Sequence, residues 1–270
     1  MQNETRQIQL KCLEILKVVD RICRENKIVY SLCGGSVVGA HLYGGCLAWD
    51  DDIDLMMTRE NYEKFIQCAK ETLPDSYVMQ NYAVCDDFTT TFTKIIDKKT
   101  TVVQQDGTVS GVFLDITVYD KIPYRKIRKI VFHWKLLQIK LAGKRKVKRL
   151  KDILENLIVF FSQKNKRKNL LKFQKKIEAW GKGEKDYAYA ELFGAYCNTK
   201  LYKPELFENY DEIMFEGENY MIVKDYIAYL ENRYERTNFY VSEEEKIAPH
   251  YQYVNFDIPY EEFLKNGESK

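Results

Sequence analysis

The chain has 270 residues, of which 45% are hydrophobic and 14% aromatic, and its net charge is only +2. This composition can bury a sizeable core and excludes an intrinsically disordered chain. No apolar run approaches the roughly 20 residues of a membrane-spanning helix, and the amino terminus lacks the apolar stretch of a signal peptide. We therefore expect a globular protein of the cytoplasm.

The first 120 residues alternate helical and extended patterns. Apolar side chains at helical spacing predict a helix over residues 4–26, and the run over 28–33 predicts a short strand that ends at Gly34-Gly35-Ser36. A second strand is predicted over 52–57 and a helix over about 58–73, with Thr58 as its cap. Runs rich in β-branched and aromatic residues predict further strands over 77–84, 90–96, 101–104 and 112–118. We expect an α/β (α+β) core with a small mixed β-sheet.

The middle of the chain is strongly basic. Residues 121–185 contain 22 Lys and Arg against 4 Asp and Glu, a net charge of +18, so that the remainder carries −16. Apolar side chains at i, i+3, i+4 and i+7 within 127–141 and 150–161 predict basic amphipathic helices. We expect this segment to meet an anionic membrane surface, with packing against the acidic remainder as the alternative. No nucleic acid is expected, because the sequence contains no recognised nucleic-acid-binding motif.

Gly181-Lys182-Gly183 separates the basic segment from an acidic, Tyr-rich end of the chain, in which a helix is predicted over 224–234. We expect three parts: an α/β core over 1–120, a helical insertion over 121–185, and a mainly helical region over 186–270 that packs on the core.

Cysteine and histidine give no sign of a structural metal or of disulfides. The seven Cys are odd in number and form no CxxC, and His41, His133 and His250 are far apart in the sequence. We expect reduced thiols and no zinc site. His250 is either a substrate contact or proton carrier, or a structural residue.

The most informative stretch is Trp49-Asp50-Asp51-Asp52-Ile53-Asp54-Leu55. In an extended strand alternate side chains share a face, which places Asp52 and Asp54 on the same side. Two unit charges about 5 Å apart repel by roughly 3 kcal/mol at an effective dielectric constant near 20, so the pair needs a cation. Mg²⁺, or Mn²⁺ in its place, is the expected cofactor, because it takes carboxylate oxygens and substrate phosphates. A solvated acidic loop or a calcium site is the alternative.

Asp115 is the single acidic residue in the apolar run over 113–117. A charge within a buried strand needs a partner. If this strand neighbours the first acidic strand, Asp115 completes a three-carboxylate site with Asp52 and Asp54. Such a site can hold one or two metal ions and orient an in-line phosphoryl displacement.

Two further groups are candidates for binding the phosphates of a donor. Backbone N–H groups at a Gly-rich turn and helix start bind phosphate, so Gly34, Gly35 and Ser36 are candidates, with an ordinary strand-to-helix turn as the alternative. Lys94 lies inside an apolar, Thr-rich strand, where it could meet donor phosphate or be an edge or surface lysine.

The order strand, Gly-Gly-Ser, helix, acidic strand and later lone-Asp strand resembles the nucleotidyltransferase fold. Within it, GGSVVGAHLYGGCLAWDDDIDLMMTRENYEKF is similar to the signature of the LicD family, which also includes the fukutin-type proteins. The likeness continues through FTKIIDKKTT, GVFLDITVYD, ELFGAY, FEGENYMIVKDYIAYLENRY and the late His250. It covers most of the chain apart from the basic middle.

The resemblance implies metal-dependent transfer of a phospho-alcohol, such as phosphocholine or phosphoribitol, from a CDP-activated donor. The implied acceptor is a sugar hydroxyl of a cell-surface glycan or its lipid-linked precursor, reached from the inner face of the membrane. By the same resemblance, Asp52, Asp54 and Asp115 are the metal-binding and catalytic carboxylates, and Gly35 and Ser36 belong to the phosphate-contacting turn. Residues 1–120 are then a nucleotidyltransferase-like catalytic core.

The chain departs from the family pattern at Leu42, where an Arg is usual. The change removes an expected contact to phosphate or to an acidic substrate. Two other functions stay open. A nucleotidyltransferase with the same carboxylates would attack a nucleoside triphosphate and release pyrophosphate, and a non-catalytic module would only hold other proteins at a membrane. The intact acidic residues disfavour the second of these.

Overall fold

The computed structural model describes residues 2–85, 91–141, 150–162, 165–193, 200–246 and 249–267. The chain groups into two compact units. Unit 1 comprises Met1–Met79, Lys94–Val118 and Glu205–Lys270, and unit 2 comprises Gln80–Thr93 and Tyr119–Pro204. The three-part division expected from the sequence stays a prediction.

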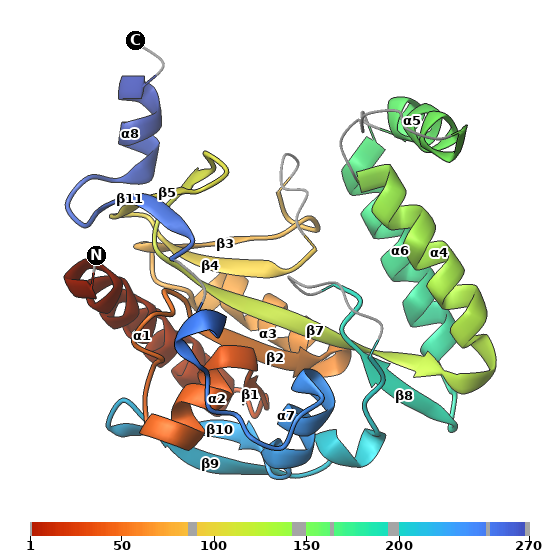
Figure 1. Ribbon diagram of the computed structural model, residues 1–270, viewed down its shortest axis with the longest axis horizontal. Helices are drawn as coiled ribbons and strands as arrows, with labels where there is room; N and C mark the ends of the chain where they lie inside the picture. The colour runs from red at the N-terminus through yellow and green to blue at the C-terminus, as the bar shows by residue number, and fades with distance from the viewer. Residues whose placement is uncertain are drawn as a thin grey trace. The chain divides into compact units, whose positions relative to one another are not determined.

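Unit 1 contains the amino-terminal helix, the strands around the acidic stretch and the carboxy-terminal region (Figure 1). Its α-helices are α1 (Gln2–Glu25), α2 (Gly34–Tyr43), α3 (Arg59–Thr72), α7 (Tyr226–Tyr234) and α8 (Tyr260–Gly267). Its strands are β1 (Ser31–Leu32), β2 (Asp54–Thr58), β3 (Tyr77–Gln80), β4 (Thr93–Asp97), β5 (Thr101–Gln104), β6 (Val109–Ser110), β9 (Tyr210–Phe215), β10 (Glu218–Val223) and β11 (Tyr251–Asn255). Only the end residues Gln80 of β3 and Thr93 of β4 are counted with unit 2. Strand β7 (Phe113–Pro123) begins in unit 1 and continues into unit 2.

The main sheet has the strand order β1-β2-β7-β4-β3 within unit 1. β1 is antiparallel to β2, with Ser31 opposite Met56 and Leu32 opposite Leu55. A second sheet has the order β11-β5-β6, and β9 and β10 form an antiparallel hairpin. Because β2 and β7 are neighbours in the main sheet, the acidic residues that they carry are brought together.

The core of unit 1 forms where the apolar face of α1 meets the rest of the unit. Ile15, Leu16 and Val19 of α1 are fully buried, as are Leu55 and Ile116 on the two central strands. α1 packs with α3, and α2 packs with α7 (Figure 1). The helical pattern predicted over 4–26 is thereby confirmed as α1, and its broad apolar face is explained by burial.

Unit 2 is built on three helices, α4 (Ile127–Leu141), α5 (Leu150–Ser162) and α6 (Lys166–Gly181), of which α4 and α6 are basic and α5 is not. The end of β7 pairs in antiparallel fashion with β8 (Tyr187–Ala190). α4 packs with α5 and with α6. The buried side chains of this core come from α4, α6, the neighbouring strands and the segments beside them: Tyr82, Ile122, Ile130, Leu137, Leu170, Phe173, Ile177, Ala190, Leu192 and Phe193. The amphipathic helices predicted over 127–141 and 150–161 are confirmed.

Among the described helices, none is both long enough and apolar enough to cross a membrane. The mixed content of helices and strands confirms the α+β fold class expected from the sequence. Several predicted strand boundaries are wrong, because β1 covers only Ser31–Leu32, β2 begins at Asp54, β3 ends at Gln80 and β7 extends to Pro123. Residues 194–196 of the ELFGAY stretch, Cys197 and the basic residues 144–149 lie outside the described part of the chain.

Candidate active site

The acidic stretch lies at the beginning of β2 and is only partly accessible to solvent. The sequence predicts a strand from Asp52, but β2 begins at Asp54, so that Asp50 and Asp52 belong to the preceding loop. The alternation of a strand therefore does not explain why Asp52 and Asp54 lie close together. Burial, followed by the charges of Asp52 and Asp115, raises the pKa of Asp54 well above its usual range. The charges of Asp52 and Asp115 thus lie close enough to Asp54 to shift its pKa, and the three carboxylates belong to one site.

Asp115 enters this site from β7. Its backbone N–H donates a hydrogen bond of 3.2 Å to the carbonyl oxygen of Ile53, which confirms that its strand lies beside the acidic stretch. Burial raises the pKa of Asp115 to about 6, although the charge of Lys94 opposes the shift. A carboxylate with a raised pKa can take up a proton at neutral pH more readily than an exposed one.

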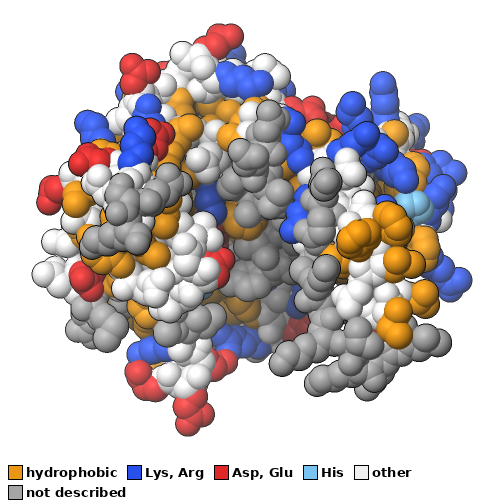
Figure 2. Space-filling model, turned by 90° about the horizontal axis from the view of Figure 1, so that it is seen from above, with side chains coloured by type: hydrophobic (Ala, Val, Ile, Leu, Met, Phe, Trp, Pro, Cys, Tyr) orange, Lys and Arg blue, Asp and Glu red, His pale blue; other side chains and the backbone are white. Residues whose placement is uncertain are grey.

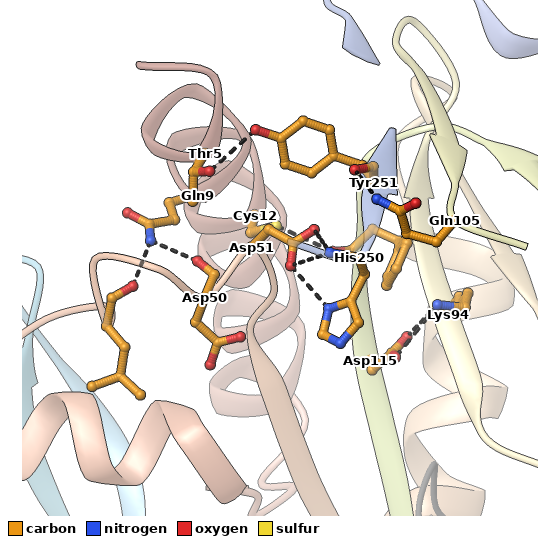
Figure 3. A network of polar contacts seen from close by, with 12 residues as sticks. Thr5, Gln9, Cys12, Asp50, Asp51, Lys94, Gln105, Asp115, His250 and Tyr251 are labelled. Carbon is orange, nitrogen blue, oxygen red and sulfur yellow. Dashed lines mark hydrogen bonds and ion pairs between the residues drawn. The ribbon is translucent and has the colours of Figure 1, made fainter. Parts of the chain in front are cut away.

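Lys94 lies on β4, the neighbour of β7 in the main sheet. Its side chain is buried, with Nζ 3.1 Å from Asp115 Oδ1 and 3.0 Å from the centre of the Phe113 ring (Figure 3). The alternative that Lys94 is an edge or surface lysine is therefore wrong. A buried cation beside a carboxylate is placed where it can also meet a phosphate.

The Gly-Gly-Ser segment forms the first turn of α2, which begins at Gly34. Gly34 has a φ of +55°, a conformation that favours glycine, and a side chain at Gly35 would collide with the Asp50 carboxylate. Ser36 Oγ accepts a hydrogen bond of 3.0 Å from the backbone N–H of Asp54, and its own proton stays available for donation. The turn thus joins the start of a helix, where N–H groups point outward, to the acidic end of β2.

Helix α7 borders the same turn, a relation that the sequence did not predict. The hydroxyl of Tyr229 accepts a hydrogen bond of 3.0 Å from the Gly34 N–H. Arg233 lies one helical turn further on and therefore on the same face of α7. A Cβ atom at Gly34 would lie 3.4 Å from Asp54 Oδ2 and 3.5 Å from Arg233 Nη2, so both groups border the turn. The only signal in the sequence was that Arg233 falls within the family-like stretch over 215–234.

His250, near the carboxy-terminal end of the chain, contacts the acidic loop, which is the segment 50–53 before β2 (Figure 3). Its Nδ1 lies 2.9 Å from Asp51 Oδ1, and its backbone N–H donates to the same carboxylate at 3.2 Å. The side-chain hydrogen bond with Asp51 raises the pKa of His250 to about 9, so the imidazole is protonated at neutral pH. The protonated imidazole of His250 therefore forms an ion pair with Asp51 of the acidic loop.

In the described part of the chain, no three His, Cys, Asp or Glu side chains are grouped as a preformed metal site. The carboxylates nevertheless fit a hard divalent cation in charge and in ligand type. Asp115 Oδ1 is buried and accepts no hydrogen bond, although Lys94 Nζ forms an ion pair with it at 3.1 Å. Burial and the charges of Asp52 and Asp51 raise the pKa of Asp50 well above its usual range. A divalent cation would relieve this crowding of negative charge.

Gln9 of α1 is hydrogen-bonded to the backbone at the start of the acidic loop (Figure 3). Its Nε2 donates to the carbonyl oxygens of Leu47 at 2.9 Å and of Asp50 at 2.7 Å, and the side chain is buried. The sequence offered no signal for this role, because Gln9 occupies an ordinary position in an amphipathic helix.

We expect Gln9→Ala to lower the free energy of unfolding by about 1–3 kcal/mol, because it removes a buried donor that serves the carbonyls of Leu47 and Asp50. Urea unfolding at equilibrium measures the change. Gln7→Ala is the matched control, since Gln7 is exposed on the same helix, and it should change stability by less than about 0.5 kcal/mol. Equal effects of the two substitutions would contradict the assigned role of Gln9.

Comparison with known proteins shows which family this chain is similar to. The family model described as "LicD/FKTN/FKRP, nucleotidyltransferase domain" matches residues 27–153, which include the Gly-Gly-Ser turn, the acidic loop and Asp115. The chain is 29% identical over 251 residues to the lipopolysaccharide cholinephosphotransferase LicD of Haemophilus influenzae, and the match covers 85% of this chain and 89% of that protein. The chain is therefore similar to the LicD family over most of its length, and residues 27–153 are similar to the nucleotidyltransferase domain of that family.

Proposed function

We propose that this protein is a transferase that moves a phospho-alcohol, with phosphocholine as the first candidate, from a CDP-activated donor to a sugar hydroxyl. The acceptor is a cell-surface glycan or its lipid-linked precursor. The observation that carries the proposal is the position of Asp54 beside the first turn of α2, with Asp115 hydrogen-bonded to the neighbouring Ile53 and with the charges of Asp52 and Asp115 raising the pKa of Asp54. The relative in Haemophilus influenzae, named as a lipopolysaccharide cholinephosphotransferase, supports the choice of phosphocholine.

In the proposed reaction the acceptor oxygen attacks the phosphorus distal to the nucleotide, and the bond from that phosphorus to the CMP oxygen breaks. CMP leaves with the electron pair of that bond, and the acceptor hydroxyl loses its proton. An acceptor within hydrogen-bond distance of Asp115 would give this proton to the carboxylate.

Asp52, Asp54 and Asp115 would hold Mg²⁺, or Mn²⁺ in its place. Such an ion, when bound, neutralises the charge on the pyrophosphate of the donor as CMP leaves. Carboxylates that repel one another in its absence would be drawn together by the ion.

Four groups are suited to bind the donor phosphates. Two are the backbone N–H of Gly35 in the first turn of α2 and the hydroxyl of Ser36, since the N–H groups of Gly34 and Ser36 already donate to Tyr229 and Cys33. The other two are the cations Lys94 and Arg233, which border the carboxylates from β4 and α7. Arg233 would thereby supply a charge that Leu42 does not, although it comes from a different helix.

We further propose that the protein works on the cytoplasmic side of a membrane, with the basic segment 121–185 toward an anionic surface. A lipid-linked acceptor would require this approach. The excess of Lys and Arg in this segment would attract anionic headgroups over about a Debye length.

A donor panel tests the proposed reaction. The purified protein is incubated with Mg²⁺ and CDP-choline, CDP-ribitol, a CDP-sugar or a nucleoside triphosphate, and thermal stability and product release are measured. We expect a CDP-alcohol to raise the melting temperature and to release CMP slowly by hydrolysis, because ligands that bind only the folded state stabilise it.

Binding of triphosphates alone, with release of pyrophosphate, would instead establish a nucleotidyltransferase. Failure of all compounds to bind, in protein shown to be folded, would favour a non-catalytic module. The same panel repeated with excess chelator tests the metal, since activity that persists undiminished would exclude the metal-dependent reaction.

A further inference from the structure

Helix α5 of unit 2 has its apolar face turned to solvent. Ile153, Leu154, Leu157, Phe160 and Phe161 are between 51% and 71% exposed. The buried positions of the same helix are Glu155, Val159 and Ser162, which are between 2% and 7% exposed. A helix that merely covers a protein core shows the opposite arrangement, with its apolar residues buried and its polar residues outside.

The two sets of residues lie on opposite faces of the helix. At 100° per residue, the five exposed apolar side chains fall within an arc of about 120° centred near Leu157. Glu155, Val159 and Ser162 fall on the opposite side, and Glu155 pairs with Lys151 at 3.3 Å. The exposed apolar face is therefore continuous and contains no charged side chain.

The other two helices of unit 2 expose basic side chains. α4 exposes Arg128, Lys129 and Lys135, and α6 exposes a further set: Lys168, Lys172, Lys175 and Lys176. Phe132 of α4 adds an apolar side chain that is 65% exposed. Figure 2 shows, on its right side, hydrophobic side chains gathered next to Lys and Arg.

The charge of this surface decides between its possible partners. A second copy of the chain would bring two strongly basic segments together, and like charges would oppose the contact. An anionic lipid surface complements the same charges and accepts apolar side chains below its headgroups. Basic residues around a helix with exposed Leu and Phe are typical of interfacial helices, which lie in the plane of the membrane.

We propose that the exposed face of α5 inserts into the interface of an anionic membrane, while the basic side chains of α4 and α6 contact the headgroups. The inserted residues are Ile153, Leu154, Leu157, Phe160 and Phe161. This inference adds a specific membrane-inserting element to the proposed function and does not depend on the identity of the donor.

Vesicle binding tests the proposal with the full chain. The variant Leu157→Ser/Phe160→Ser/Phe161→Ser is compared with a control, Leu10→Ser/Met214→Ser/Leu264→Ser, which removes exposed apolar side chains of unit 1. In co-sedimentation with phosphatidylglycerol-containing vesicles at low salt, we expect the first variant to lose at least about tenfold in partitioning and the control to lose less than about twofold. Binding of the parent should be weaker with pure phosphatidylcholine and at high salt.

A depth measurement tests insertion directly. Tryptophan placed by Phe161→Trp should be quenched by brominated lipids, whereas Met214→Trp should add no quenched signal over the parent. A parent that fails to bind anionic vesicles, or an α5 variant that binds as well as the parent, would overturn the proposal. It would also be overturned if light scattering without lipid showed a dimer that only the α5 variant disrupts, because the face would then bind a second copy.

CMP release from a CDP-alcohol in the absence of vesicles separates this proposal from the proposed reaction. The α5 variant should retain the parental rate, since none of its substituted residues belongs to the candidate active site. Loss of vesicle binding with an unchanged rate supports the membrane role of α5 whatever the donor proves to be.

Discussion

Replacing Asp54 with Asn is expected to reduce transfer at least about 10³-fold, which corresponds to a loss of roughly 4 kcal/mol of transition-state stabilisation. Asp54 lies at the first residue of β2, beside the Gly-Gly-Ser turn and the other two carboxylates. The substitution keeps the shape of the side chain but removes a charge that the metal needs. Initial rates of CMP release in Mg²⁺ measure the loss.

The same substitution should preserve or raise the melting temperature of the metal-free protein. Burial and neighbouring carboxylates raise the pKa of Asp54, so its ionised form is disfavoured in the folded state and neutral Asn relieves that cost. Stabilisation by added Mg²⁺ should disappear in the variant, because binding to the folded state is its source. Asp257→Asn, at an exposed position of unit 1, is the control and should change neither property. Parental activity in Asp54→Asn would contradict the metal mechanism.

Replacing Arg233 with Gln is expected to lower kcat/KM for the CDP-alcohol about 10²-fold, or roughly 3 kcal/mol. The guanidinium borders the Gly34 turn and Asp54, where the donor phosphates are proposed to bind. A guanidinium can donate two parallel hydrogen bonds to a phosphate, which a neutral amide cannot reproduce. Steady-state kinetics over a range of donor concentrations separate an effect on KM from an effect on kcat.

Two companion variants distinguish phosphate binding by Arg233 from a structural role. Arg233→Lys should recover part of the activity because it keeps the positive charge. Arg236→Gln, which removes a guanidinium paired with Glu245 shortly after the end of α7, should leave donor kinetics within about twofold of the parent. If Arg233→Gln shows unchanged donor affinity and rate, Arg233 does not contact the donor.

The sequence by itself identified the features that depend on local pattern. Helical spacing of apolar residues predicted α1, α4 and α5, because burial of one face requires that period. Three clustered Asp before a hydrophobic run, and a lone Asp in a buried strand, predicted carboxylates that need positive partners. The motif around Asp52 and Asp54 is specific enough to indicate the family without any knowledge of the fold.

Only the tertiary structure decided which distant residues complete the site. Arg233 borders the Gly34 turn together with Asp54, His250 contacts Asp51, and Gln9 contacts the acidic loop, each from a separate part of the chain. A local pattern carries no information about such contacts, because they depend on how the helices and strands pack.

Which face of α5 is covered and which is exposed was also decided by the tertiary structure alone. Its sequence shows that one face is apolar, but only packing against α4 determines that Glu155 and Val159 are covered while Leu157 and Phe160 stay exposed. Periodicity specifies that a helix has two unlike faces. Which face is covered depends on the neighbouring elements, and these are brought together only when the chain folds.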